Sequence, residues 1–282
     1  MSKKFAFKIA VISLLLTAIN SCYYERESDQ LKVCYVRSGS IWTMNIDGSE
    51  QTQITYPPVS AYDNAPSWSP DGRKILFHSD RDGNSEIFVI NADGSGLKQL
   101  THTSIPDTNI CPTWSSDGKR IVFAGTRTPT SYVFIATTNA NIIKSYNFIK
   151  SLAYPTLSPD DNYLYLTENT GAPYPFRRIN LLTNNTNDIY ETNAGYTSIS
   201  ISPDGKTIAA TYTLVSHIHL WNETSYIDFL PNAYDPCWTP DGKTIVYISA
   251  GDIYRINIDG TNNKPLTTEG GCSSPCVQGK PK

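Results

Sequence analysis

The chain has 282 residues, a formal net charge of −3 and 39% hydrophobic residues. This length is enough for one large domain. Lysine and arginine form no run beyond the N-terminus, so we do not expect a nucleic-acid partner.

The N-terminus has the pattern of an export signal. Three lysines precede an apolar run at 9–19, which is too short to cross a bilayer but fits the core of a signal peptide. The run is followed closely by Ser21-Cys22, and this ending resembles the lipobox of bacterial lipoproteins. The resemblance implies that residues 1–21 are a signal peptide and that Cys22 carries a lipid anchor.

Residues 22–30 form an expected tether with three acidic residues. After it come three short β-rich runs, at 32–37, 40–45 and 52–55, with an Asp-Gly turn at Asp47-Gly48. These runs look like a blade of four strands from which the first strand is missing.

A complete unit follows at 62–101. Its expected strands, which we letter a to d, are 66–69, 74–79, 86–91 and 98–101. Asp71-Gly72 turns strand a into strand b, and Asp93-Gly94 turns strand c into strand d. Such dipeptides between short β-rich runs are typical of hairpins. The same frame fits 109–147, 154–190, 196–230 and 234–268.

The turn aspartate recurs at steps of 46, 43, 44 and 37 residues, at Asp71, Asp117, Asp160, Asp204 and Asp241. β-rich units with a period near 40 residues are typical of propeller blades. The strand a that the first unit lacks has a candidate at 274–278. We therefore predict an all-β fold over 31–282. It is a six-bladed β-propeller of four-stranded antiparallel blades, closed by a C-terminal strand that completes the N-terminal blade.

The repeats resemble those of the TolB-type propeller family. The resemblance is carried by Pro-Ser-Trp-Ser-Pro-Asp-Gly at 66–72, by its copies at 112–118 and 236–242, and by Asn-Ala-Asp-Gly at 91–94. It implies a role in cell-envelope integrity through contact with a peptidoglycan-associated lipoprotein. TolB carries an α/β domain before its propeller. Only residues 23–31 separate Cys22 from the first expected strand, so we expect no such domain here.

The repeated residues have structural explanations. An aspartate in a tight turn bonds its own backbone, so we expect the turn aspartates to be structural. Trp68, Trp114 and Trp238 are expected to pack between neighbouring blades. Segment 79–86 alternates oxygen-bearing side chains as a calcium loop does, but it lacks the glutamate at the EF-hand spacing, and we expect a solvated hairpin tip.

We expect no catalytic residue, cofactor or metal. His217 and His219 share one face of a predicted strand, but no third ligand is near them in the sequence, and most catalytic metal sites need three protein ligands. No nucleophile elbow, phosphate loop or His-Glu-x-x-His motif occurs.

An exported protein can form disulfides. In the repeat frame, Cys34 of strand b faces Cys276 of the closing strand, and we predict a disulfide between them. A register shift of one residue leaves Cys34–Cys272 as the alternative. Such a long loop would contribute about 5 kcal/mol at most.

Binding residues are expected on the rim that carries the irregular d–a and b–c loops, because the opposite rim consists of regular Asp-Gly turns. The expected residues at the channel mouth are Asp63, Asn64, Asn109, Tyr154, Tyr196, Tyr234 and Asp235. Farther out, the candidates for contact with a protein are Arg81, Arg127, Tyr174 and Phe176. The alternative for the tyrosines is that they only cap the channel.

These observations predict a non-catalytic binding or scaffold propeller of the bacterial cell envelope. We expect a monomer, lipid-anchored to the outer membrane on its periplasmic side or at the cell surface. The expected partner is an envelope protein, or a peptide or glycan ligand. Two alternatives remain open: a carbohydrate-active enzyme resembling the propeller lyases of uronates, and a substrate-capture or sensory partner of an envelope transporter.

Overall fold

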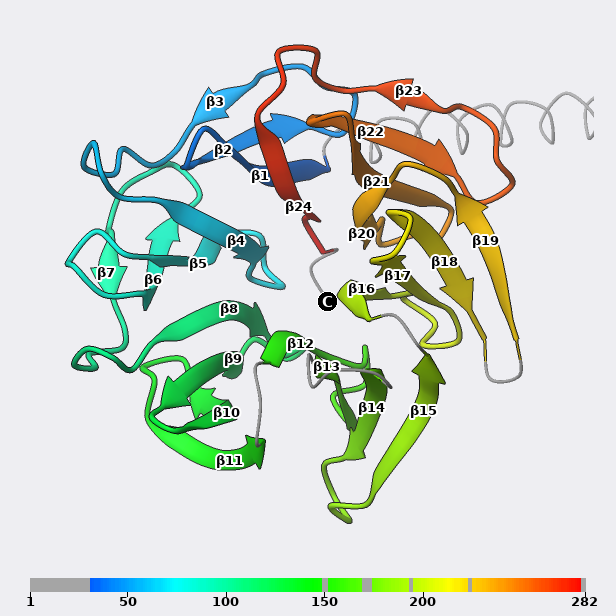
Figure 1. The fold of residues 1–282 in the computed structure, drawn as a ribbon. Coiled ribbons are helices and arrows are strands. Elements are labelled where there is room, and N and C mark those ends of the chain that lie inside the picture. The colour runs from blue at the N-terminus through cyan, green and yellow to red at the C-terminus, as the bar shows by residue number, and fades with distance from the viewer. Residues whose placement is uncertain (1–30, 149–151, 169–173, 193–194, 223–224, 280–282) are drawn as a thin grey trace, which may run out of the picture.

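The computed structural model describes residues 31–148, 152–168, 174–192, 195–222 and 225–279. The predicted signal peptide, Cys22 and the tether lie outside these ranges. The described residues form six four-stranded antiparallel sheets, and each sheet is one blade (Figure 1). Among these residues no helix has the length and apolar character needed to cross a membrane.

The strands of each blade are given from the channel outward. Blade 1 has β24 (Cys272–Val277), β1 (Lys32–Arg37), β2 (Ser40–Asn45) and β3 (Thr52–Gln53); blade 2 has β4 (Asp63–Trp68), β5 (Lys74–Ser79), β6 (Glu86–Asn91) and β7 (Lys98–Gln99). Blade 3 has β8 (Asn109–Trp114), β9 (Arg120–Arg127), β10 (Thr130–Thr137) and β11 (Ile142–Phe148); blade 4 has β12 (Leu152–Leu157), β13 (Tyr163–Glu168), β14 (Tyr174–Asn180) and β15 (Thr186–Thr192). Blade 5 has β16 (Tyr196–Ile201), β17 (Ile208–Tyr212), β18 (His217–Trp221) and β19 (Tyr226–Leu230); blade 6 has β20 (Tyr234–Trp238), β21 (Thr244–Ser249), β22 (Asp252–Asn257) and β23 (Lys264–Pro265).

The ring closes where the two ends of the chain share blade 1. β24 pairs antiparallel with β1, with Cys276 opposite Cys34 and Cys272 opposite Arg37. The N–H of Gln278 donates to the carbonyl oxygen of Lys32 over 2.8 Å and extends the pairing. Figure 1 shows β24 in red beside β1 in blue. The predicted fold, blade count and closing strand are therefore confirmed.

The core lies between blades. Trp68 packs with Ile41 of blade 1 and Phe77 of its own blade, and Trp238 packs with residues of blades 5 and 6. Trp114 lies against the cluster between blades 2 and 3. Large rings fill the wedge between neighbouring sheets, as expected, so each blade is stabilised mainly by the blades beside it.

The turn aspartates are structural. The Ser69 hydroxyl donates to Asp71 over 2.6 Å, the Arg73 N–H donates to the same carboxylate oxygen, and the Lys74 N–H donates to the Ser69 oxygen. The arrangement recurs in the other full blades. The serine hydroxyl, followed by the backbone donors, lowers the pKa of Asp71, Asp117, Asp160 and Asp204.

Segment 79–86 is a hairpin connection whose tip at Asp82-Gly83 is exposed, as expected, but its C-terminal end is buried. Glu86 is 2% exposed and accepts hydrogen bonds from Thr101, Thr103 and Asn109. Asn84 donates to the carbonyl oxygens of Thr103 and Asp107. Asn84 and Glu86 of this segment therefore connect blade 2 to the loop that leads into blade 3.

We predict that Ser115→Ala destabilises the protein. Ser115 is fully buried, and its hydroxyl bonds Asp117 at 2.6 Å and both backbone groups of Arg120. Loss of these bonds should lower the free energy of unfolding by about 1–3 kcal/mol. In a chain of this size, thermal unfolding should then shift down by at least about 2–4 °C. The exposed Ser60 provides the control Ser60→Ala, and an equal melting temperature for both variants would contradict the turn analysis.

Candidate functional site

All six inner strands have a β-bulge. In five of them, a residue with positive φ precedes a proline: Ala65-Pro66 (φ 48°), Cys111-Pro112 (51°), Tyr154-Pro155 (44°), Asp235-Pro236 (52°) and Ser274-Pro275 (48°). The pairing register shifts at the same place. Proline is tolerated because the inner strand is the edge of its sheet. Positive φ is unfavourable for residues with a side chain, so the surrounding structure must hold these bulges.

The bulges surround a cavity of about 240 Å³ on the ring axis, lined by all six inner strands. A bulge redirects the side chain at the distorted position. The first layer of lining residues, which we call the bulge ring, consists of Ala65, Cys111, Tyr154, Ser198, Asp235 and Ser274. The next layer, the hydroxyl–thiol ring, consists of Ser67, Thr113, Thr156, Ser200, Cys237 and Cys276.

Among the described residues that line the cavity, Asp235 is the only one with a charged side chain. Its carboxylate accepts hydrogen bonds from the Ser198 hydroxyl at 2.7 Å and from the Ser274 N–H at 3.1 Å. Its own N–H donates to the Thr211 hydroxyl at 3.0 Å. Asp235 is therefore fixed by blades 5 and 1, on either side of its own blade, and gives the cavity an anionic wall.

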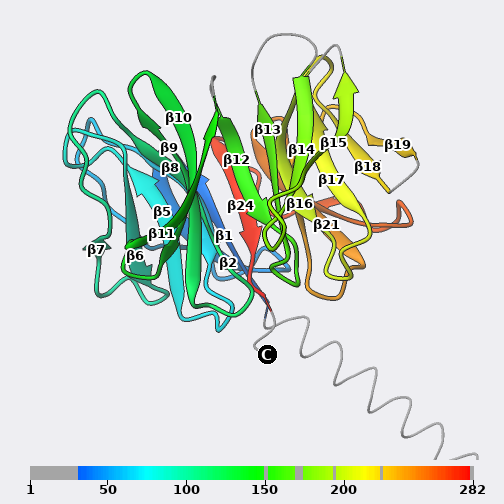
Figure 2. The same cartoon turned by 90° about the horizontal axis from the view of Figure 1, so that it is seen from below.

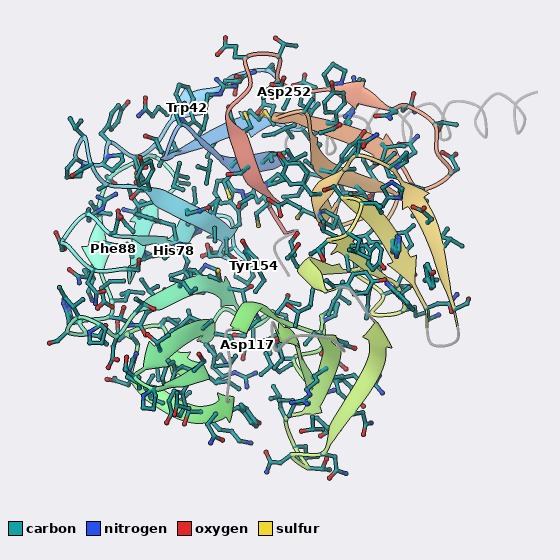
Figure 3. All side chains as sticks on the ribbon, viewed as in Figure 1. Trp42, His78, Phe88, Asp117, Tyr154 and Asp252 are labelled. Carbon is teal, nitrogen blue, oxygen red and sulfur yellow. The ribbon has the colours of Figure 1, made fainter. Side chains whose placement is uncertain are left out.

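Tyr154 stands at the same level of the channel. It is 36% exposed and lies nearer the ring axis than Trp42 or Phe88 (Figure 3). Burial of the hydroxyl, with the neighbouring Cys111 and Asp235, raises the pKa of the Tyr154 phenol. The phenol is therefore neutral at physiological pH and can donate a hydrogen bond to a bound group.

The hydroxyl–thiol ring pairs inner-edge backbone groups. The Trp238 N–H donates to the Ser200 oxygen of the preceding blade at 3.2 Å, and the Val277 N–H donates to the Cys237 sulfur at 3.2 Å. A small side chain with a lone pair thus satisfies an N–H that the sheet leaves unpaired. Ser200 and Cys237 both carry such a lone pair, so a hydroxyl and a thiol can serve the same purpose at this position.

Three thiols meet at the closing seam. Cys276 lies opposite Cys34 in the β1–β24 register and is hydrogen-bonded to both Cys34 and Cys237. All three are free thiols in the structure. Burial raises the pKa of Cys34, and hydrogen bonding to Cys276 raises that of Cys237. Cys272 faces Arg37, so the register favours Cys276 as the partner of Cys34, and the disulfide itself stays a prediction.

Two predicted mouth residues are buried structural groups instead. Asp63 is fully buried and receives both hydrogen bonds from the Arg81 guanidinium, at 2.6 and 2.7 Å. Arg81 also lies over the rings of Phe77 and Phe88. Arg81 was predicted to contact a partner at the outer rim, but its guanidinium is bound to the buried Asp63 carboxylate. The structure therefore places Asp63 away from the channel mouth and the Arg81 side chain away from the rim surface.

The same correction applies to the next blade. Asn109 is fully buried, and its amide bonds Glu86 at 2.8 Å and the Arg127 guanidinium at 3.1 Å. Arg127 lies over the Phe134 ring. This pair repeats the Asp63–Arg81 arrangement with an amide in place of the carboxylate.

The three tyrosines predicted at the channel mouth lie in different environments. Tyr154 lines the cavity, whereas Tyr196 is 6% exposed and bonds His219 at 2.9 Å, and Tyr234 is half-buried against the cluster between blades 6 and 1. Asn64 is exposed beside the bulge ring and bonds the Ser274 hydroxyl at 3.3 Å. The predicted site is thus brought together only in part, at Asn64, Tyr154 and Asp235.

Tyr174 and Phe176 belong to β14, where Tyr174 pairs with Thr192 and Phe176 with Tyr190. Their side chains lie outside the described part of the structure, so their predicted contact with a partner stays a prediction.

His78, Ser198 and Ser274 also support the site and were not predicted from the sequence. The ring of His78 accepts the Cys111 N–H at 3.3 Å and supports that bulge, and burial lowers its pKa to about 4. Ser198 and Ser274 hold Asp235. Aligning the repeats at the residue before each inner-strand proline could have found both serines.

The histidines on β18 also differ from expectation. A third ligand was not evident in the sequence, but Asp228 of the neighbouring β19 lies 2.9 Å from His217. The c–d hairpin pairing supplies this neighbour.

Comparison with known proteins agrees with this architecture. Residues 37–222 match the family model of the TolB beta propeller domain. No match was found among curated proteins. TolB from Acinetobacter baumannii is similar in structure, with a TM-score of 0.78 and 17% identity over 90% of this chain and 68% of that chain.

Two further structures are similar. A chain of a nidogen/laminin complex has a TM-score of 0.70 and 10% identity over 88% of this chain and 98% of that chain. Hydrazine synthase from Kuenenia stuttgartiensis has a TM-score of 0.70 and 14% identity over 90% of this chain and 48% of that chain. At these identities the similarity establishes the fold alone. Proteins that share this fold include enzymes.

We predict that mild oxidation joins Cys34 to Cys276, because they face each other across β1 and β24. Peptide mass spectrometry of the unreduced protein should find the two peptides linked, with the loss of two hydrogens. Thermal unfolding should move to a higher temperature, since the bond closes nearly the whole chain. Cys111→Ser should leave the link unchanged. Recovery of Cys34 as an alkylated thiol after oxidation would refute the pairing.

Proposed function

The chain belongs to the TolB beta propeller domain family, and on that premise we propose that it is a non-catalytic binding module whose central cavity receives a basic group from a partner polypeptide. The observation that carries this proposal is Asp235, a fixed carboxylate in a cavity otherwise lined by hydroxyl, thiol and apolar groups. A lysine or arginine side chain, or a terminal amine, would supply the opposite charge and the hydrogen-bond donors.

The size of the cavity limits the occupant. Its volume of about 240 Å³ is below the roughly 300–1,000 Å³ of most small-molecule sites. A side chain or the tip of an extended segment fits this space, and a folded domain does not. The rest of the partner would then lie on the irregular rim.

The negative charge of Asp235 favours this function over the uronate lyase alternative. A uronate is an anion, and Asp235 would repel it within the cavity. A basic peptide group gains from the same charge. We retain the non-catalytic function for this reason.

We further propose that the protein is anchored in the bacterial envelope through Cys22. The first described strand starts at Lys32, which bonds Gln278, and the side chain of Gln278 packs on Gly72 of an Asp-Gly turn. Both described chain ends therefore lie on the regular rim, and β24 runs along the ring axis toward it (Figure 2). With the short tether 22–30, the regular rim would face the membrane and the irregular rim would face the partner.

Binding of a partner in the central cavity predicts a crosslink in intact cells that depends on the position of the crosslinking residue. A photoreactive benzoylphenylalanine in place of Tyr154 should form an adduct with one partner protein. The same residue in place of Leu97, which is exposed in the c–d connection of blade 2, should not. In the Tyr154 background, Asp235→Asn should reduce the adduct about tenfold or more, since a bond to a charged group contributes about 1.5–3 kcal/mol.

Asp93→Asn, in an exposed turn, is the matched control and should leave the adduct yield unchanged. Equal adducts at positions 154 and 97, or an adduct that does not respond to Asp235→Asn, would exclude the cavity as the binding site.

The anchor predicts a change in partitioning. The wild-type protein should enter the detergent phase of Triton X-114, because acyl chains bring it into micelles. Cys22→Ser should stay in the aqueous phase, whereas Cys111→Ser should behave as wild type. A detergent-phase Cys22→Ser protein would contradict lipidation at this residue.

A further inference from the structure

The outer hairpin of blade 5 brings two imidazoles and a carboxylate together, away from the channel. His217 and His219 lie two residues apart on β18, so they share one face of the sheet. Asp228 on β19 is the register partner of His219 and lies on that same face. One ligand atom from each residue lies within 4.8 Å of the others. β18 and β19 are the outer pair of the blade (Figure 1).

The distances suit a metal ion. The Nδ1 atom of His217 lies 2.9 Å from Asp228 Oδ2, and the Nε2 atom of His219 lies 3.8 Å from Asp228 Oδ1. Ligand atoms about 2.0–2.2 Å from a tetrahedral zinc ion are about 3.4 Å from one another. The two measured separations lie on either side of this value. The Asp228 side chain is 52% exposed, so it can rotate to admit an ion.

His219 is held as metal-binding histidines are. Its Nδ1 atom bonds the Tyr196 hydroxyl at 2.9 Å. Its ring is stacked between Tyr212 and Tyr226, with both ring centroids 4.8 Å away. When Nδ1–H donates to Tyr196, the Nε2 lone pair points to Asp228, and such a bond to the second ring nitrogen fixes the tautomer of a metal ligand.

An ion pair between His217 and Asp228 explains only part of this arrangement. It accounts for the 2.9 Å contact at the surface, and an exposed ion pair contributes little to stability. It gives no reason for three tyrosines, one from each of the other strands of the blade, to fix the orientation of His219 beside the pair.

We propose that His217, His219 and Asp228 bind a divalent transition-metal ion of the zinc class. Two imidazoles and one carboxylate are ligands that suit zinc, copper, nickel and iron. Three protein ligands leave a coordination position for water or an external group. The site opens to solvent beside Asp228, at a distance from the central cavity, so it does not depend on the proposed binding function.

The test is a zinc titration of the purified protein after dialysis against a chelator, followed by isothermal calorimetry. One equivalent of Zn²⁺ should bind. His217→Ala and Asp228→Asn should each weaken binding at least about tenfold, and Tyr196→Phe about 10- to 100-fold through the lost orienting bond. His102→Ala, which removes an exposed histidine of another blade, should leave binding unchanged.

His217 and Asp228 are at the surface, so their variants should fold, and circular dichroism checks this. Failure to bind one equivalent of zinc would overturn the proposal. Zinc binding that persists unchanged in the His217→Ala/Asp228→Asn double variant would also overturn it, because the ion would then be bound elsewhere, for example by the buried cysteines.

Discussion

The pairing of β24 with β1 is the constraint on which the rest of the molecule depends. A blade buries its two faces only against its neighbours, so a ring of blades is stable when it has no open end. The clusters on both sides of blade 1 show this directly. One joins Val33 and Val277 to Val246 of blade 6, and the other joins Cys34 to Phe77 of blade 2.

Closure also creates the channel site. Ser274 of β24 donates its N–H to Asp235 of blade 6 and bonds Asn64 of blade 2. The closing strand thus contacts the anionic residue and the exposed amide beside it, and it is one of the six inner strands that line the cavity. The proposed metal ligands lie on the outer strands of blade 5, and the residues that hold them belong to that blade alone. The two sites can therefore be removed separately by mutation.

The sequence predicted the features that local chemistry determines. Asp-Gly turns and short β-rich runs mark each hairpin, so the blade count, the closing strand and the facing of Cys34 and Cys276 could be read from the repeat. The hydrogen-bond partners of side chains were predicted poorly. Asp63 and Arg81, for example, are 18 residues apart and bond only because the b–c loop brings Arg81 back to β4. The bulges were hidden since tyrosine, cysteine and aspartate rarely take positive φ. Asp228 was missed because its closeness to the histidines comes from strand pairing.

Native-state hydrogen exchange tests the closure most directly, since it reports which strands open without global unfolding. If β24 closes the ring, its amides exchange as slowly as those of β20, the equivalent inner strand of blade 6. Fast exchange throughout 272–278, with β20 still protected, would contradict closure, because the ring would then be open at blade 1.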